Sequence, residues 1–328
     1  MERATPLRTD AQPRIPEPVS TIPIREFTRR ALGAFWILDG LLQLQPRMFQ
    51  LAMLHNIMEP LIVGEPAWLA GTVSWAIHVM TPDVRIWNAL IVGVQLLLGI
   101  LILLGRTPKV TRTGLWLSLF WVCTVWLFGE GLGGVLTGSA TVVAGEPGAV
   151  VLYGWIAVTL LLPDRFWQFG RGFNVIRDAA AVFFGLAAVQ QLVPVFWTPM
   201  GLASQFQSTL SVEPPYIQRT ILWAVTVSFD HPVLVNLLLV LALGFVSWRL
   251  FQERPGRAAY IVAAVVMFLI WWCGQGFGAI FTGLSTDLNT MPLVALMMAP
   301  AWMDRYGSFR SDSYQTVRPA IGDRPVAF

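Results

Sequence analysis

Long stretches without a charged residue are the feature that most limits what this chain can fold into. The longest cover 20, 34 and 29 residues, at Ile86–Gly105, Ala179–Val212 and Ala258–Thr286. A helix needs roughly 20 consecutive apolar residues to cross a bilayer. Only 12% of the residues are charged, and the mean hydropathy is +0.61, whereas about a quarter of the residues of a soluble domain are charged. The sequence therefore predicts an all-α, polytopic membrane protein.

Apolar runs read against charged residues place eight membrane spans along the chain. They are predicted at residues 31–46, 86–105, 113–136, 147–163, 179–196, 232–249, 258–282 and 288–303. The first, fourth and eighth are short or polar, so a tilted, kinked or re-entrant course stays open for these three. Tails at 1–30 and 304–328 flank the spans.

The positive charges predict how the spans are oriented. With the N-terminus inside, 19 of the 22 arginine and lysine residues are cytoplasmic, and only Arg47, Arg85 and Arg219 lie outside. Cytoplasmic loops of membrane proteins carry such an excess, so we expect both termini in the cytoplasm. This placement also argues against nucleic acid as a partner.

The 21 arginines against one lysine are typical of a GC-rich bacterial genome, and the N-terminal tail lacks the apolar core of a secretory signal. The predicted location is a bacterial cytoplasmic membrane.

The chain aligns with itself, which indicates an internal duplication. At a shift of 148 residues the matches include Phe35 with Phe183, Gln43 with Gln191, Glu65 with Glu213, Trp75 with Trp223 and Asn88 with Asn236. At a shift of 145 residues, GEGLGGVLTG (Gly129–Gly138) lies on GQGFGAIFTG (Gly274–Gly283). Each half then has four spans inserted the same way round. The predicted architecture is two tandem four-helix bundles, at 31–165 and 178–303.

A long connection rich in aromatic residues follows the first span of each half, at 47–85 and 195–231. Trp68 and Trp75 are seven residues apart, and the second connection repeats this spacing, so each pair shares one helix face. Amphipathic rings favour the headgroup level of a bilayer. Helices lying in the outer interface are therefore predicted, and aromatic packing inside the protein is the alternative.

Several apolar segments of the first half resemble a known family. VGVQLLLGILILLGR (Val92–Arg106), RTGLWLSLF (Arg112–Phe120) and LGAFWILDGLLQL (Leu32–Leu44) are similar to the DoxX-like family of small four-helix membrane proteins. The resemblance covers the chain to about residue 135 and, more faintly, the second half. It implies the fold of that family. Because some members are similar to the membrane part of thiosulfate:quinone oxidoreductase, it also implies electron transfer to quinone with a redox partner subunit. It assigns no catalytic residue, and the tandem arrangement departs from the family pattern.

Polar side chains at membrane depth form the candidate site. An ionised group at mid-bilayer costs on the order of 3 kcal/mol, so such groups usually face a cavity or a partner. Asp39 and Glu130 are the two carboxylates, and their counterparts in the second half are uncharged, which favours a site in the N-terminal half. The residues expected to bind a ligand or relay protons are Asp39, Gln43, Gln95, Glu130 and Gln275. The alternative is hydrogen bonds that only join the helices.

The glycines of the repeated motif match GxGxxG at Gly129, Gly131 and Gly134. A dinucleotide site requires this pattern between a strand and a helix, and here it lies late in an apolar run. The spacing of Gly129 and Gly133 instead predicts close helix packing. Space for a ligand beside Glu130 is the alternative.

The sequence predicts no metal site. Both cysteines lie in apolar runs without the spacing of a metal site or a disulfide framework. Imidazole and thioether groups suit monovalent copper, but methionine is also a common gap-filler in apolar helices. The weak candidates for copper are His55, His78, Met53 and Met80.

Three functions fit these features. The favoured one is a quinone-interacting membrane subunit of a redox system, in which Asp39 and Glu130 hydrogen-bond or relay protons. The others are a small-solute or ion carrier and a non-catalytic membrane scaffold or assembly factor. The sequence contains no hydrolase triad and no nucleotide-binding loop, and whether the chain itself catalyses a reaction stays open.

Overall fold

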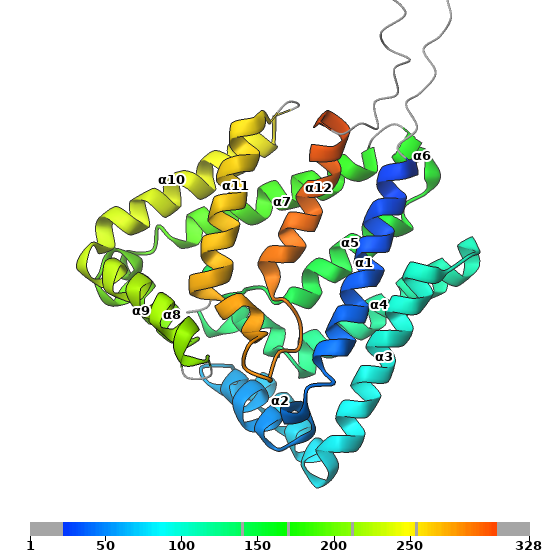
Figure 1. Cartoon of the computed structure of the whole chain (residues 1–328), viewed down its shortest axis with the longest axis horizontal. Helices are drawn as coiled ribbons and strands as arrows, with labels where there is room; N and C mark the ends of the chain where they lie inside the picture. The colour runs from blue at the N-terminus through cyan, green and yellow to red at the C-terminus, as the bar shows by residue number, and fades with distance from the viewer. Residues whose placement is uncertain (1–21, 139–140, 169–170, 211–212, 253–254, 307–328) are drawn as a thin grey trace, which may run out of the picture.

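A computed structural model describes residues 22–138, 141–168, 171–210, 213–252 and 255–306 (Figure 1). Every element within these ranges is helical. The α-helices are α1 (Ile22–Leu42), α2 (Ala67–Met80), α3 (Val84–Leu104), α4 (Pro108–Phe128), α5 (Ala149–Leu161), α6 (Asp164–Gln168), α7 (Arg171–Gln190), α8 (Met200–Gln207), α9 (Pro215–Asp230), α10 (Pro232–Leu250), α11 (Arg257–Leu269) and α12 (Thr290–Tyr306). The short 3-10 and π turns are η1 (Pro46–Phe49), η2 (Leu54–Met58), η3 (Glu59–Ile62), η4 (Thr81–Asp83), η5 (Gly131–Thr137), η6 (Val142–Ala144), η7 (Pro194–Trp197), η8 (Ile270–Gly274) and η9 (Gly276–Ala279).

Several helices are suited to lipid rather than to water. Within the described residues, four helical stretches are long and apolar enough to cross a membrane: Ala67–Leu104, Pro108–Phe128, Pro232–Leu250 and Arg257–Gly274. Between 22% and 44% of their most apolar windows is buried inside the molecule, so most of this apolar surface faces outward. Exposing it to water would cost about 25 cal/mol per Å². The chain is therefore a helical membrane protein.

Helices lie at all eight predicted positions, with shifted ends. Helix α1 begins at Ile22, so residues 22–30, predicted as part of the N-terminal tail, belong to this helix. Helix α4 ends at Phe128 and the α11–η8 stretch at Gly274, so the predicted spans 113–136 and 258–282 extend too far. Helices α5 and α12 are shorter apolar helices.

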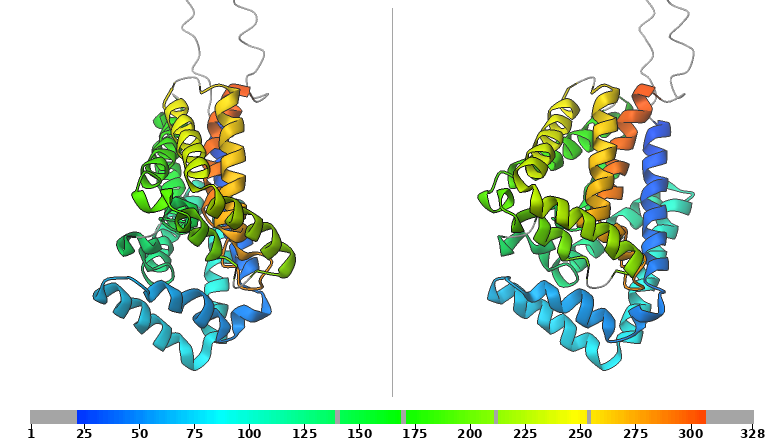
Figure 2. Two further views of the ribbon diagram at one scale, coloured as in Figure 1. Left: turned by 90° about the vertical axis from the view of Figure 1, so that its left-hand side faces the viewer. Right: turned by 60° about the vertical axis from the view of Figure 1, so that its left-hand side comes forward.

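The helices pack in two similar groups (Figure 1). In the first group, α1 lies along α3, and α4 packs on α3. In the second group, α7 lies along α10, and α11 packs on α10. Helices α5 and α12 lie between the groups and contact each other as well as α1 and α7. The start of α1 and the end of α12 lie at one end of the molecule, and α2 lies at the other (Figures 1 and 2).

Hydrogen bonds recur at matched positions of the two groups. The side-chain amide of Asn88 donates to the backbone carbonyl of Gln43 at 2.8 Å, and that of Asn236 donates to the backbone carbonyl of Gln191 at 2.9 Å. Both asparagines are fully buried. Two indole N–H groups repeat in the same way. That of Trp126 donates to the backbone carbonyl of Pro147, and that of Trp271 donates to the backbone carbonyl of Leu288.

The repeated glycine motif ends the helix instead of packing it. Residues 131–134 all have positive φ, with Leu132 at 54°, and residues 276–279 repeat this course with Phe277 at 54°. Glycine adopts this conformation without the steric cost that a Cβ imposes. The prediction that Gly129 and Gly133 pack helices is wrong, because consecutive left-handed residues cannot continue a right-handed helix.

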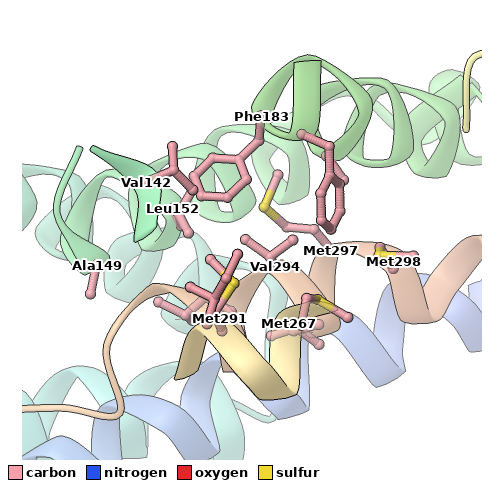
Figure 3. Close-up of a cluster of buried hydrophobic side chains, with 14 of the residues drawn as sticks. Val142, Ala149, Leu152, Phe183, Met267, Met291, Val294, Met297 and Met298 are labelled. Carbon is pink, nitrogen blue, oxygen red and sulfur yellow. The ribbon is translucent and has the colours of Figure 1, made fainter. Parts of the chain in front are cut away.

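A continuous apolar core fills much of the second group and extends into the first. Figure 3 shows Phe183 of α7 converging with Met291, Val294 and Met297 of α12 and with Met267 of α11. All five side chains are at least 90% buried. The matched interior of the first group is different, because it holds a cavity.

Candidate functional site

A cavity of about 370 Å³ lies inside the first group, and we call it the apolar cavity. Its size falls within the usual range of about 300–1,000 Å³ for small-molecule sites. Helices α1 to α5 all contribute to its wall. The wall is mainly aromatic and thioether, with Trp36, Trp75, Trp87, Trp121, Phe128, Met53, Met58 and Met80.

Polar side chains from four helices converge on this apolar cavity. Asp39, Gln43 and Gln95 line it and are 2%, 3% and 6% exposed. The Tyr153 hydroxyl lies beside the Asp39 carboxyl, close enough for the two groups to interact. The buried atoms without a hydrogen-bond partner among the described residues include Asp39 Oδ1, Gln43 Oε1, Gln95 Oε1, Trp121 Nε1, Glu130 Oε2 and the Tyr153 oxygen. Buried polar atoms are rarely left unpaired, so this cluster is suited to a bound ligand or to water.

Close approach of α1 and α3 brings these groups together. A Cβ on Gly40 would lie 2.8 Å from Leu96 Cγ, and one on Gly99 would lie 2.8 Å from the carbonyl oxygen of Gly33. Because glycine has no Cβ, the two helices touch along their length, and Gln95 of α3 faces the same cavity as Asp39 of α1.

Trp36 fixes the inner wall of the cavity. Its indole N–H donates to Ser118 Oγ at 3.0 Å, and its ring centroid lies 4.4 Å from that of Tyr153. A hydrogen-bonded tryptophan that packs on a tyrosine has little freedom to turn. The ring of Tyr153 is thereby held in the cavity wall.

A second cavity, of about 460 Å³, adjoins the first, and we call it the polar cavity. Four carboxylates line it: Glu65, Glu130, Glu146 and Asp287. Among the described residues of its lining, none is basic. The two cavities share Ile57, Gly129, Glu130, Thr286 and Asp287. Glu130 and Asp287 therefore stand at the junction between them.

Local backbone geometry places the two junction carboxylates. Glu130 Oε1 accepts a hydrogen bond from the backbone N–H of Val150 at 3.4 Å, in the first turn of α5. Its other oxygen lies over Gly148, where the positive φ of 96° and the missing side chain leave room for it. Asp287 accepts from the backbone N–H of Asn289 at 2.5 Å and from the hydroxyl of Thr286 at 2.8 Å. Asn289 has φ +66° and sits directly before α12.

Burial shifts the acid–base behaviour of the polar cavity. Desolvation raises the pKa of Glu130 to about 8, and the nearby Asp287 carboxylate contributes to this increase. Desolvation also raises the pKa of Glu146 to about 7, although a hydrogen bond from Gln190 opposes this change. The pKa values of Glu65 and Asp287 are raised by the same cause. These carboxyl groups therefore exchange protons at higher pH than ordinary ones.

The structure brings four of the five predicted site residues together. Asp39, Gln43, Gln95 and Glu130 all line the apolar cavity. Gln275 lines only the polar cavity. Its side-chain amide donates to Thr290 Oγ1 at 2.7 Å and to the carbonyl of Val142 at 3.3 Å, and its oxygen accepts from the N–H of Met291 at 3.4 Å. Gln275 thus joins two loops to the start of α12.

Sequence reasoning misses five polar residues of the site: Glu65, Trp121, Glu146, Tyr153 and Asp287. A third alignment shift of 141 residues places Glu146 on Asp287 and Tyr153 on Val294. This shift is the available signal, because it marks a carboxylate retained by both halves and a polar residue held by one.

The candidate copper ligands lie in two different places. Met53 and Met80 are buried in the wall of the apolar cavity. His55 and His78 are exposed, and His55 Nδ1 is 2.6 Å from Glu59 Oε1. No group of three or more His, Cys, Asp or Glu side chains with a metal-binding arrangement occurs in the described ranges.

The two halves differ at the positions that make the site. Residues matched with Asp39, Gln95 and Tyr153 are Ala187, Leu243 and Val294, which are at most 1% exposed. They belong to the apolar core that Figure 3 shows in part. At these positions the first half therefore has polar side chains in the wall of the apolar cavity, whereas the second half has packed apolar side chains. Comparison of the chain with protein-family models, curated proteins and solved structures finds no match.

Proposed function

We propose that this chain is a DoxX-like, quinone-binding membrane subunit of a redox system, with the quinone ring held in the apolar cavity. The observation that carries the proposal is the combination of aromatic and thioether walls with a buried cluster of unpartnered donors and acceptors. Such a site suits a flat, apolar ring that has polar substituents.

The polar cluster matches both redox forms of a quinone ring. The carbonyl oxygens of a quinone need donors, and the Tyr153 hydroxyl and Trp121 Nε1 supply them. The hydroxyls of a quinol need acceptors, and Asp39 Oδ1 and the oxygens of Gln43 and Gln95 supply these. Pairing these groups with a ligand removes the cost of leaving them buried and unsatisfied, about 1–3 kcal/mol for each neutral group.

The cavity also has a route to the lipid. Trp75 and Trp87 line it and are 59% and 38% exposed, so its wall reaches the molecular surface. Helices α3 and α4, which also line the cavity, are among the stretches long enough to cross a membrane. A quinone can therefore enter from the bilayer while its isoprenoid tail stays in the lipid.

The proposed membrane arrangement has eight spans, two tandem four-helix units and both termini in the cytoplasm. The repeated hydrogen bonds of Asn88 and Asn236 and the repeated left-handed turns support the duplication. The start of α1 and the end of α12 lie at the same end of the molecule, which supports an even number of spans (Figure 1). In this orientation the polar cavity faces the outer side.

Quinone binding tests the function directly. The full chain is purified in mild detergent, co-purifying quinones are identified by mass spectrometry, and ubiquinone-1 and menaquinone-1 are titrated against tryptophan fluorescence. Tyr153→Phe and Gln43→Leu are expected to raise Kd by about tenfold each, which is the effect of losing one hydrogen bond of about 1.4 kcal/mol. Gln191→Leu is the matched control, since Gln191 is a buried glutamine at the equivalent position that lines neither cavity.

The competing functions give different results. Absence of quinone binding by the folded wild-type chain contradicts the proposal. A small-solute or ion carrier is the second candidate, favoured by the meeting of two cavities at Glu130 and Asp287; it predicts pH-dependent flux into liposomes that Asp39→Asn abolishes. A scaffold predicts neither binding nor flux, and these variants then change only folding or partner recovery.

A further inference from the structure

We propose that the polar cavity is the proton route between the apolar cavity and the surface of the protein. The route begins at Glu65 and Glu146, passes the junction carboxylates Glu130 and Asp287, and ends at Asp39 and Tyr153. It rests on the proposed function for its purpose, because quinone and quinol differ by two protons as well as two electrons. The geometry itself does not depend on the ligand.

The mouth of the route is the pair of glutamates that line the polar cavity alone. Glu65 and Glu146 are close enough for the charge of one to raise the pKa of the other. Both oxygens of Glu65 and Oε1 of Glu146 are without a hydrogen-bond partner among the described residues. Exposed residues of the same lining, Asn56, Pro60 and Val63, connect the cavity to the surface.

Glu130 and Asp287 form the middle step of the route, because both cavity walls share them. These two carboxylates interact electrostatically with each other, and both also interact with Asp39. Glu130 keeps one oxygen without a partner in the described part of the chain, so this oxygen is available to take up a proton. A proton that leaves the apolar cavity therefore meets an acceptor at the junction of the two cavities.

The inner end of the route is formed by Asp39 and Tyr153, which both line the apolar cavity. The Tyr153 hydroxyl can give its proton to the Asp39 carboxylate or receive one back, and both groups line the apolar cavity. Every titratable side chain of the two linings is then part of the series: Asp39, Glu65, Glu130, Glu146, Tyr153 and Asp287. The described lining includes no basic side chain that would hold these carboxylates permanently ionised.

The second half provides a matched comparison for the route. Glu213 corresponds to Glu65; it is buried, and like Glu65 it has both oxygens unpartnered in the described residues. It lines neither cavity. Gln275 corresponds to Glu130 and keeps the backbone contact that Glu130 makes. A glutamine is therefore compatible with this turn, and Glu130→Gln is expected to fold.

Deuterium exchange of the Asp39 carboxyl group tests the route without any quinone. Infrared spectra of the full chain in lipid are recorded from pH 5 to pH 9 during exchange from water to heavy water. The Asp39 C=O band is identified as the band that Asp39→Asn removes. The double variant Glu130→Gln, Asp287→Asn is expected to slow exchange of this band at least tenfold, and Glu146→Gln is expected to slow it less. Glu213→Gln is the control and is expected to exchange at the wild-type rate.

Each outcome decides the proposal. Wild-type exchange in the double variant overturns the route, and so does the absence of an Asp39 band at every pH, because a carboxylate that never takes up a proton cannot relay one. Equal slowing by Glu213→Gln also overturns it, since the effect is then general to the fold. Quinone binding is measured separately, so loss of the proposed function leaves the exchange result standing, and intact binding with unchanged exchange removes the route alone.

Discussion

Glu130 and Gln275 occupy matched positions, and one atom separates their roles. Each accepts a hydrogen bond of 3.4 Å from the first turn of the following helix, from Val150 and Met291 respectively. The amide nitrogen of Gln275 then donates to Thr290 and Val142. A carboxylate cannot donate when ionised, so the corresponding oxygen of Glu130 stays unpartnered within the described structure and faces the cavities.

The raised pKa values predict that the protein loses stability as the pH rises. Glu130 has a pKa of about 8, and Glu146 and Glu213 have pKa values of about 7, against 4.5 for an ordinary glutamate. In this window the folded chain binds more protons than the unfolded chain, so the free energy of unfolding decreases with pH. We expect the melting temperature in detergent to fall from about pH 5 to about pH 8.

Variants at the same residues check the cause of this pH dependence. Glu130→Gln and Glu146→Gln remove titrating groups, so each is expected to make the fall in melting temperature shallower. Asp230→Asn changes an exposed carboxylate at the end of α9 and lies outside both cavities; it is expected to leave the slope unchanged. A melting temperature that rises with pH over this window contradicts the assignment.

At the scale of elements, the left-handed turns η5 and η9 decide where the long apolar helices end. Gly133 has φ +67°, and a Cβ there would clash with the carbonyl of Pro147. Gly138, at the end of the same turn, has φ +74° but open space around it. One turn therefore offers two glycines with the same backbone strain and different surroundings.

Alanine at these two glycines separates strain from collision. Gly138→Ala adds only the left-handed penalty, about 1–2 kcal/mol. Gly133→Ala adds overpacking of about 1–3 kcal/mol to that penalty, so we expect it to lower the free energy of unfolding by about 3 kcal/mol or more. Thermal or denaturant unfolding of both variants measures the difference. Equal losses contradict the role of the Pro147 carbonyl as the barrier to a side chain at Gly133.

Sequence reasoning locates the helices because apolar length and charge spacing are direct consequences of crossing a bilayer. It misplaces the ends of α4 and the α11–η8 stretch, since the residues beyond them are as apolar as a helix, and only their φ values show that the helix has stopped. The sequence identifies only part of the site, because it shows which residues are polar but not which aromatic residues border a cavity. Asp39 and Glu130 are conspicuous among apolar neighbours, whereas Tyr153 resembles a packing aromatic until the cavity beside it is known.

At the scale of the whole molecule, side chains of each half form hydrogen bonds with the backbone of a loop in the other half. Gln190 of α7 accepts from the backbone N–H of Val142 at 2.9 Å, in the connection between α4 and α5. In the reverse direction, Arg47 donates to the carbonyl of Thr282 at 2.6 Å, and Gln45 accepts from the N–H of Ser285 at 3.2 Å. These contacts connect the polar cavity wall to both halves.

Removing one of these contacts is expected to weaken the whole fold. Gln190→Leu leaves the N–H of buried Val142 without its acceptor, which costs about 1–3 kcal/mol. The matched residue of the first half is Leu42, so leucine suits this helix. Gln207→Leu, at an exposed position of α8, is the control and is expected to stay within about 0.5 kcal/mol of the wild type. Unfolding by either heat or denaturant gives the comparison, and equal stability of the two variants contradicts a link between the halves at Gln190.

The orientation of the chain is the last prediction, and α3 makes it testable at two residues. Helix α3 has 21 residues, which is about 32 Å at 1.5 Å per residue, enough to cross the hydrocarbon core. If it crosses, Asn56 before it and Lys109 after it lie on opposite sides of the membrane. The excess of basic residues predicts that Lys109 lies in the cytoplasm, so Asn56, in the polar cavity lining, is predicted to face outward.

Single cysteines at these positions decide between the two orientations. In a Cys123→Ala, Cys273→Ala background, which removes both native cysteines, intact cells are treated with a membrane-impermeant maleimide. Asn56→Cys is expected to be labelled, and Lys109→Cys is expected to be labelled only after lysis; both side chains are exposed, so accessibility within the protein does not differ. The reverse pattern contradicts the orientation and places the mouth of the proton route in the cytoplasm. Labelling of both in intact cells contradicts the crossing of α3 itself, because no single span then separates the two residues.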